Sequence, residues 1–386
     1  MSDQQESLYW SLLYILISKE KYELVYFSDE NQEAWLESTQ KSNQTIIRFK
    51  RYNFDWANQV EHDIIQIQPL VEQLMKRSLR KVPSFYNVYI SEQEPVDDWK
   101  MKMEGMRVAA PIETVWFTND NGDEQRKIML TSLKLQEEDV QSIQALHGEN
   151  PLVLREHIAR LLESRQKQRE TIVNHAKPIM TKTLMTIQIA MFCILEWNGG
   201  SMNTATLIHF GAKYNPLILQ GEWWRFFTPM FLHIGLLHLL MNTVALYYIG
   251  NQVERTIGNT RFLFIYLFSG FAGSVFSFVA SNNVSAGAST AIFGCFSALL
   301  YITYTYSHIF SKGVLQNVIT LIVINLLFGF IVPGIDNAGH IGGLVGGFLA
   351  ASIVHVPNQK LAIWKRGAAL ALSIVLLGSL LWYGYQ

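Results

Sequence analysis

Charged residues and cysteines are both scarce in this sequence. Asp, Glu, Lys and Arg make up 16% of the 386 residues, the hydrophobic fraction is 49%, and the net charge is −1. A nearly neutral chain lacks the basic surface of a general nucleic-acid binder, so that class of protein is excluded. The only two cysteines, Cys193 and Cys295, lie inside apolar runs, which excludes a disulfide framework. The N-terminal MSDQQES lacks the pattern of a signal peptide, so we expect the following domain in the cytoplasm.

The hydrophobic residues that are present are concentrated in the second half of the chain. Residues 1–180 resemble an ordinary soluble domain, and a series of long apolar runs follows. A helix needs about 20 apolar residues to cross a bilayer. We therefore expect seven spans, at 180–197, 228–248, 261–281, 287–307, 314–332, 340–356 and 367–384. The sixth is short and carries Gly343 and Gly347 in GxxxG spacing, which favours burial among other helices.

Basic residues near the span ends predict the orientation, because loops rich in Lys and Arg stay in the cytoplasm. They occupy alternate loops: Arg165, Lys167, Arg169, Lys177 and Lys182; Arg255 and Arg261; Lys312; and Lys360, Lys365 and Arg366. The opposite loops carry few, chiefly Lys213 and Arg225. We expect a multi-pass protein of the cell membrane with its N-terminus in the cytoplasm and its C-terminus outside.

Polar residues interrupt three of the expected spans. His233, His238 and Asn242 lie on the second, Ser289 opens the fourth within GASTAIFG, and His340 opens the sixth. Ionisable residues inside spans are costly and indicate function. These three spans run in the same direction, so the groups lie in the outer half of the membrane. They share one depth if 281–288 (SNNVSAGA) dips into the protein and lines a wet cavity.

Together these residues can form a serine hydrolase site. A serine hydroxyl needs a base, usually histidine, and the charge on the attacked carbonyl oxygen needs donors already in place. His238 and Asn242 share one helix face and can donate, as can the backbone N–H of Ser289 at a helix N-terminus. Taken singly, Ser289 is more simply a packing residue and His233 a helix–helix hydrogen bond.

An acidic third member is not evident. Asp336 is the nearest candidate, but it lies on the outer loop four residues before His340, so we predict a dyad. The polar groups lie only on the outer side and trace no path across the membrane, which makes a transporter a weak alternative.

The ordered motifs resemble those of the rhomboid intramembrane serine proteases. The matching pieces are Trp224-Arg225, His233-x4-His238-x3-Asn242, Glu254-Arg255-x2-Gly258, Gly287-Ala288-Ser289 and His340-x2-Gly343-x3-Gly347. The resemblance covers roughly residues 180–360. It implies a six-helix bundle with a water-filled cavity open to the outside. It also implies an endopeptidase that cleaves single-span membrane proteins near the outer membrane face, without a metal or a cofactor.

The resemblance implies a role for each matching residue. By it Ser289 is the nucleophile, His340 is the base, and His238 and Asn242 line the oxyanion hole. The supporting residues are His233, Phe293 (on which the His340 ring packs), Gly287, Thr290, Trp224, Arg225, Glu254, Gly343 and Gly347.

One residue departs from the family pattern, because Thr290 stands where a glycine usually follows the serine. Threonine continues a helix at least as well as glycine, so the backbone N–H can stay in place. Its bulk can press on the sixth span or narrow the pocket for the residue before the cut. We expect an active enzyme that prefers small side chains there. The alternative is a pseudoprotease or adaptor that binds membrane helices without cutting them.

The N-terminal region shows mixed α/β signals. We expect helices at 6–18 and 55–78, strands at 21–28, 45–52, 84–91 and 113–118, and a turn at 119–122. The order of these elements can match a nuclease-like core, but no pair of acids with a lysine stands at the needed places. His62, His147 and His157 are scattered, and we expect them on the surface. We interpret this region as regulatory or substrate-presenting, with partners on the cytosolic side.

The whole chain is thus expected to be an α-helical polytopic membrane protein with an N-terminal soluble α/β domain. Its parts are a cytosolic domain (1–150), a basic amphipathic linker helix that can rest on the inner leaflet (151–178), a rhomboid-like six-helix core (179–360) and a seventh transmembrane helix (361–386).

Overall fold

The computed structural model separates the chain into two compact units, Met1–Gln166 and Lys167–Gln386. It describes residues 3–19, 22–38, 45–76, 84–105, 112–119, 137–146, 149–306, 310, 312–332, 334–357 and 363–386. His147, Lys360 and most of the expected 119–122 turn lie outside these residues. The boundary at 166 falls inside the expected linker helix, because α6 (Pro151–Val173) runs through it and packs its Leu154 and Ile158 on the N-terminal unit.

The N-terminal unit is built on a mixed sheet in the order β1-β2-β3-β4-β5. The strands are β1 (Tyr22–Ser28), β2 (Glu33–Ser38), β3 (Thr45–Arg51), β4 (Ser84–Ile90) and β5 (Ile112–Phe117). The first three are antiparallel neighbours, and the last three are parallel. A parallel pair needs a crossover connection, and α2 (Ala57–Lys76) supplies it between β3 and β4.

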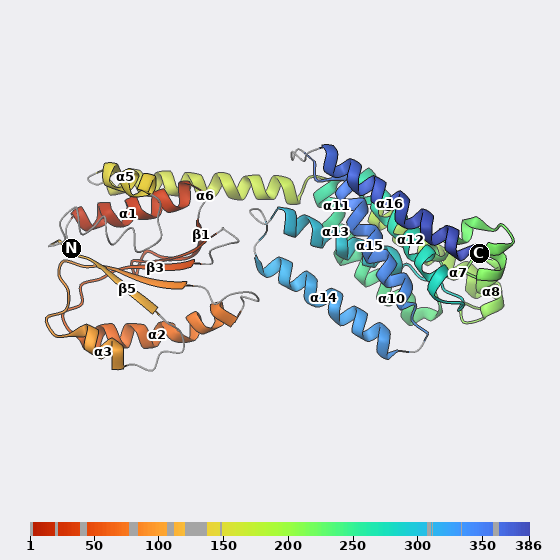
Figure 1. The fold of residues 1–386 in the computed structure, drawn as a ribbon, viewed down its shortest axis with the longest axis horizontal. Coiled ribbons are helices and arrows are strands. Elements are labelled where there is room, and N and C mark those ends of the chain that lie inside the picture. Colours follow the sequence, from red (N-terminus) through yellow and green to blue (C-terminus); the bar gives the residue numbers. More distant parts are fainter. Residues whose placement is uncertain are drawn as a thin grey trace. The chain divides into compact units, whose positions relative to one another are not determined.

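Helices cover both faces of this sheet (Figure 1). On one face lie α1 (Asp3–Ser18), α5 (Glu137–Leu146) and the start of α6; on the other lie α2 and α3 (Trp99–Gly105). On the first face Leu12 of α1 joins the same buried cluster as Ile47 and Val88. On the second, Val60 and Ile64 of α2 pack with Tyr89, Trp99 and Trp116. The helix expected at 55–78 therefore makes one layer of the core with its apolar face.

One strand of the sheet was missed by the sequence analysis. The β2 segment, EAWLES, contains no β-branched residue and four good helix formers, so its composition does not favour a strand. It is nevertheless buried between β1 and β3, and its pairing with these neighbours decides its conformation.

A buried charge cluster joins β2, β3, β4 and α2. Arg48, 1% exposed, reaches Glu33 (Nε–Oε1 2.8 Å) and Asp63 (Nη2–Oδ1 2.9 Å). Lys50 Nζ and the Tyr89 hydroxyl also donate to Asp63. A pair of acids and a lysine therefore do converge, contrary to the expectation. The guanidinium between the two carboxylates makes the cluster a salt-bridge network, and its acids are too far apart in sequence for spacing to reveal them.

The second unit is helical. Its longer helices are α7 (Met180–Trp197), α10 (Gly235–Ala245), α12 (Asn259–Ala280), α13 (Ser289–Thr305), α14 (Lys312–Ile331), α15 (Asn337–Val354) and α16 (Ile363–Gly384). Among the described residues, α12, Gly313–Ile331 of α14, α15 and α16 are long and apolar enough to cross a membrane, and α13 is apolar but shorter. The polytopic helical fold expected from the sequence is confirmed; the number of crossings stays a prediction.

The expected second span is not one helix. Residues Thr228–Phe231 form a 3-10 turn (η2), α10 begins only at Gly235, and a π turn (η3, Leu246–Gly250) leads into α11 (Asn251–Ile257). His233 therefore precedes the helix instead of lying within it. The short elements α8 (Thr204–His209), α9 (Asn215–Leu219) and η1 (Trp223–Phe226) make up the connection from α7.

The glycine-rich α15 lies at the centre of the unit, packed on α12 and α13 (Figure 1). A Cβ on Gly343 would lie 2.1 Å from the carbonyl oxygen of Thr290, and one on Gly347 would lie 2.3 Å from that of Gly294. The missing side chains let α15 approach the α13 backbone, which is the close packing that GxxxG spacing permits. This contact brings the start of α15 beside the start of α13.

Candidate active site

Ser289 and His340 meet where α13 and α15 begin. Ser289 is the first residue of α13, and its Oγ lies 2.8 Å from Nε2 of His340 in the first turn of α15. His340 is 6% exposed, whereas Ser289 is half-buried, so the hydroxyl stays accessible from one side. With the proton on Nδ1, Nε2 can accept the serine proton, which is the arrangement of a nucleophile and its base.

The His340 ring is held by stacking. Its centroid lies 4.2 Å from that of Phe293, one turn after Ser289, with 20° between the ring planes. Within the described part of the chain, Nδ1 of His340 is buried and has no hydrogen-bond partner. Asp336 instead caps α15, its Oδ1 accepting from the Gly339 N–H at 2.9 Å. Asp336 thus orients the helix and makes no hydrogen bond to the imidazole.

The loop before Ser289 is pressed against two histidines. Gly287 has φ +150°, and a Cβ there would lie 2.6 Å from Cε1 of His238, so only glycine fits between the loop and this ring. The N–H of Ala288 points to Nε2 of the fully buried His233 at 3.4 Å. The His233 and His238 rings lie edge to face, 5.4 Å apart. These contacts place the segment 287–289 beside α10.

Asn242 lies one turn after His238 on the same face of α10. It is buried, and its Nδ2 donates to the His238 carbonyl at 3.0 Å, which leaves its second amide hydrogen available. The Asn242 amide and the His238 ring lie on the face of α10 that meets the loop before Ser289 at His238, and the N–H of Ser289 lies at the start of α13. Stabilisation of a developing oxyanion requires donors of this kind held in advance.

Thr290 packs against the start of α15, which is the expected sixth span and one of the two positions considered for its side chain. It is 7% exposed, and a Cβ on Gly273 of α12 would lie 2.7 Å from its Cβ, while one on Gly339 of α15 would lie 2.9 Å from its Cγ2. The side chain therefore fills a gap that two glycines leave between these helices. This contact agrees with the alternative that Thr290 presses on the sixth span, and its role in the pocket for the residue before the cut stays a prediction.

The connection between α7 and α10 is held together by hydrogen bonds of a buried arginine. Arg225 is 4% exposed; its Nε donates to Glu222 at 2.6 Å and its Nη1 to the carbonyls of Ile208 and Ala212 at 2.7 and 2.9 Å. The neighbouring Trp224 is 44% exposed. The pair thus holds the loop together on one side and presents an aromatic ring on the other.

Two residues in the connection between α7 and α10 support the site but were not predicted from the sequence. Lys213 is 1% exposed, and its Nζ donates to the carbonyls of Ser281 and Asn283, while its backbone pairs with Ser285. Asn215 donates to the carbonyls of Phe278 and Ser281. Both anchor the loop that leads to Ser289. A signal existed, since Lys213 is one of the few basic residues in the expected outer loops.

Glu254 supports the opposite end of the bundle. Fully buried in α11, it accepts hydrogen bonds from the N–H groups of Ile179, Met180 and Thr181 and from the Thr181 hydroxyl. A carboxylate at this position satisfies the free N–H groups of α7 and is favoured by the helix dipole. Among the described residues, none of the His, Cys, Asp and Glu side chains form a group able to hold a metal ion.

Comparisons with known proteins point to one family. Residues 220–357 match the rhomboid domain. The chain is 40% identical over 386 aligned residues to the Rhomboid protease GluP of Bacillus subtilis (strain 168), covering 98% of this chain and 75% of that protein. It is 37% identical over 138 residues to the Putative rhomboid protease YdcA of the same organism, covering 35% of this chain and 69% of that protein. It is also 38% identical over 147 residues to RHOMBOID-like protein 4 of Arabidopsis thaliana, covering 37% of each chain.

Proposed function

Because this chain belongs to the rhomboid family and is an intramembrane serine protease, we propose that Ser289 and His340 form its catalytic dyad. The observation that carries the proposal is the 2.8 Å contact between Ser289 Oγ and His340 Nε2. The stacking of Phe293 on the imidazole supports it, because a fixed ring keeps the base aimed at the hydroxyl.

The reaction then proceeds in two halves. Oγ of Ser289 attacks the scissile carbonyl carbon as its proton passes to Nε2 of His340, and the carbonyl oxygen becomes an anion. His238, Asn242 and the Ser289 N–H donate to that anion. His340 returns the proton to the leaving amine, which departs and leaves an acyl-enzyme. A water then attacks the ester carbonyl and gives a proton to His340. His340 passes this proton to Oγ of Ser289 as the C–Oγ bond breaks, which releases the carboxylic acid product and restores the free serine.

The substrates are proposed to be single-span membrane proteins, cut near the outer face of the membrane. The support is the alternation of basic residues, which predicts that the starts of α13 and α15 lie on the outer side. The polar loop 281–286 beside the site can admit water. Helical peptide bonds are shielded, so the cleaved stretch must unwind, which favours substrates with helix-breaking residues. By the same argument the N-terminus is cytoplasmic, and the N-terminal unit is proposed to regulate the enzyme or present substrate.

A fluorophosphonate probe tests this proposal on the purified full chain. We expect the wild type to be labelled and to cleave a model single-span substrate, and Ser289→Ala to lose both. Ser297→Ala is the matched control, since Ser297 lies two turns later in the same helix, is buried and bonds only to the Gly294 carbonyl in the described structure. A wild type that is neither labelled nor active would favour a non-hydrolytic helix binder.

A further inference from the structure

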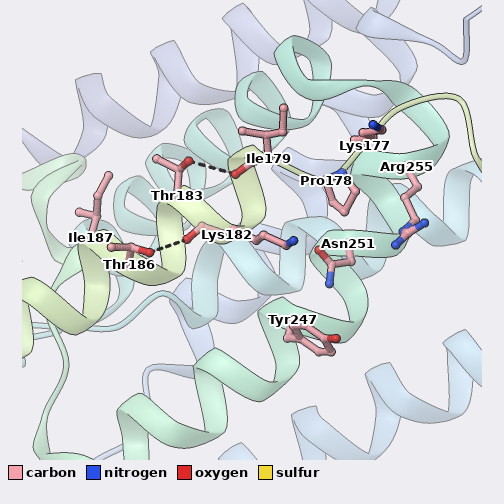
Figure 2. A pocket seen from close by; sticks show the side chains of 10 residues that line it. All are labelled: Lys177, Pro178, Ile179, Lys182, Thr183, Thr186, Ile187, Tyr247, Asn251 and Arg255. Atoms are coloured by element: carbon pink, nitrogen blue, oxygen red, sulfur yellow. Dashed lines mark hydrogen bonds between the residues drawn. The ribbon is translucent and has the colours of Figure 1, made fainter.

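A cavity of about 700 Å³ lies between α7 and the η3–α11 segment, away from Ser289 (Figure 2). Arg255 follows His238 by about 25 Å along α10, η3 and α11, at about 1.5 Å per residue, so this cavity is at the other end of the bundle. None of the residues that line it belongs to the catalytic machinery described above. Its lining includes Lys177, Lys182 and Arg255, but no acidic residue.

Three cationic side chains line the part of the cavity where α7 begins (Figure 2). Lys177 precedes α7, Lys182 lies in its first turn and Arg255 lies on α11; all three are exposed. In the part of the chain that the structure describes, no ion pair involves any of them. The adjacent Glu254 carboxylate faces the N–H groups of α7, which already occupy both of its oxygens. This end therefore carries positive charge without an internal counter-ion.

The rest of the lining runs along the bundle and combines apolar side chains with the polar residues Thr183, Thr186 and Asn251. Figure 2 shows Ile187 at the end away from Lys177 and Arg255, with Tyr247 below. Ile187 is 40% exposed and Tyr247 48%, and each lies about two helical turns from the cationic end. The hydroxyls of Thr183 and Thr186 are turned to the helix backbone, bonding to the carbonyls of Ile179 and Lys182. The wall beyond the charges is therefore suited to hydrocarbon.

We propose that this cavity binds one anionic phospholipid, with its phosphate among Lys177, Lys182 and Arg255 and an acyl chain along Ile187 and Tyr247. A cluster of Lys and Arg at the end of membrane helices attracts anionic headgroups. The apolar wall distinguishes the site from a simple phosphate site. The lipid bridges the start of α7 and the end of α11, two segments that Glu254 also joins.

Native mass spectrometry of the full chain tests the proposal. The protein in neutral detergent is titrated with phosphatidylglycerol or phosphatidylcholine, and bound lipid is counted. We expect the wild type to retain phosphatidylglycerol preferentially. Lys182→Gln/Arg255→Gln should weaken that binding roughly 30-fold, about fivefold for each charge removed. The matched control, Lys365→Gln/Arg366→Gln, removes two charges from the first turn of α16 outside the cavity and should bind as the wild type does.

Inorganic phosphate distinguishes a lipid from a free anion. Millimolar phosphate should not displace the bound lipid, because it cannot use the apolar wall; complete displacement would overturn the proposal. A wild type that binds phosphatidylglycerol and phosphatidylcholine equally would also overturn the proposal. An equal loss of phosphatidylglycerol binding in the control variant would overturn it as well. Lys177 lies between α6 and α7, outside both helices. Lys177→Gln therefore serves as a second variant if the double variant does not fold, and we expect it to bind phosphatidylglycerol about fivefold more weakly. Unchanged retention in Lys177→Gln would then count against the site.

Discussion

At the residue scale, the question of a dyad or a triad depends on the partner of His340 Nδ1, which is buried and has no hydrogen bond within the described residues. Asp336 makes its hydrogen bond to the Gly339 N–H, and asparagine can make the same bond. We therefore expect Asp336→Asn to keep cleavage within about tenfold of the wild type. His340→Ala should lower it by on the order of 10³-fold or more, because the proton then has no acceptor. Initial rates on one substrate measure both, and a loss in Asp336→Asn as deep as in His340→Ala would identify a triad.

Gly287 offers a second prediction at this scale. Its φ of +150° and the 2.6 Å approach to His238 leave no space for a methyl group. We expect Gly287→Ala to push the loop away from His238 and reduce both cleavage and probe labelling at least tenfold. Gly221→Ala is the control, since it also has positive φ but nothing within 4 Å of its added Cβ. Equal effects of the two substitutions would show that backbone strain, and not the contact with His238, is responsible.

At the scale of elements, the packing of α12, α13 and α15 decides what Thr290 does. Its side chain occupies the space beside Gly273 and Gly339, so we expect Thr290→Gly to leave the preference for the residue before the cut unchanged. The change should instead destabilise the protein by about 1–2 kcal/mol, from a helical glycine and a small cavity. Profiling against a substrate varied at one position, with thermal unfolding alongside, measures both. A widened preference would restore the pocket role that the sequence suggested.

The charge cluster between β2, β3 and α2 predicts a pH effect. Burial alone would raise the pKa of the Asp63 carboxyl, but the hydrogen bonds and charge of Arg48, with Lys50 and Tyr89, lower it to about 2. A depressed carboxyl pKa stabilises the fold above its unfolded value near 4, and this contribution is lost as pH falls toward 2.

Pepsin, which cuts in this pH range, can report the loss. We expect the N-terminal unit of the full chain to become cleavable between about pH 4 and pH 2, with rates normalised to an unstructured substrate in the same tube. Asp63→Asn should already be cleaved at pH 4, since it removes one of the two carboxylates that face the buried Arg48 guanidinium. Identical pH profiles for the two proteins would show that Asp63 does not govern this transition.

At the scale of the whole molecule, the two units have separate cores, and every proposed catalytic residue lies in the second. Arg48→Ala should destabilise the N-terminal unit by about 3–5 kcal/mol, because it leaves two buried carboxylates with the Lys50 ammonium as their remaining counter-charge in the described structure. Probe labelling of Ser289 should persist. Lys102→Ala is the control, because the Lys102–Glu61 pair is 39% exposed on both sides and contributes little. Lost labelling in Arg48→Ala alone would show that the two units depend on each other.

The sequence by itself determined the class of fold, the family and the candidate residues, because these depend on local patterns. Apolar runs predict membrane helices from their composition alone, and the His238-x3-Asn242 spacing identifies one helix face. The same local logic missed β2, whose composition favours a helix, and extended the second span past His233, which the structure places before α10.

Only the tertiary structure decided which groups meet. The direction of the Thr290 side chain depends on glycines in α12 and α15, the Arg48 cluster on strands and a helix that sequence spacing does not connect, and the cationic cavity on the pairing of α7 with α11. The 2.8 Å contact of Ser289 with His340 likewise joins residues 51 positions apart. Contacts of this kind depend on how helices and strands pack, and no window of sequence contains that information.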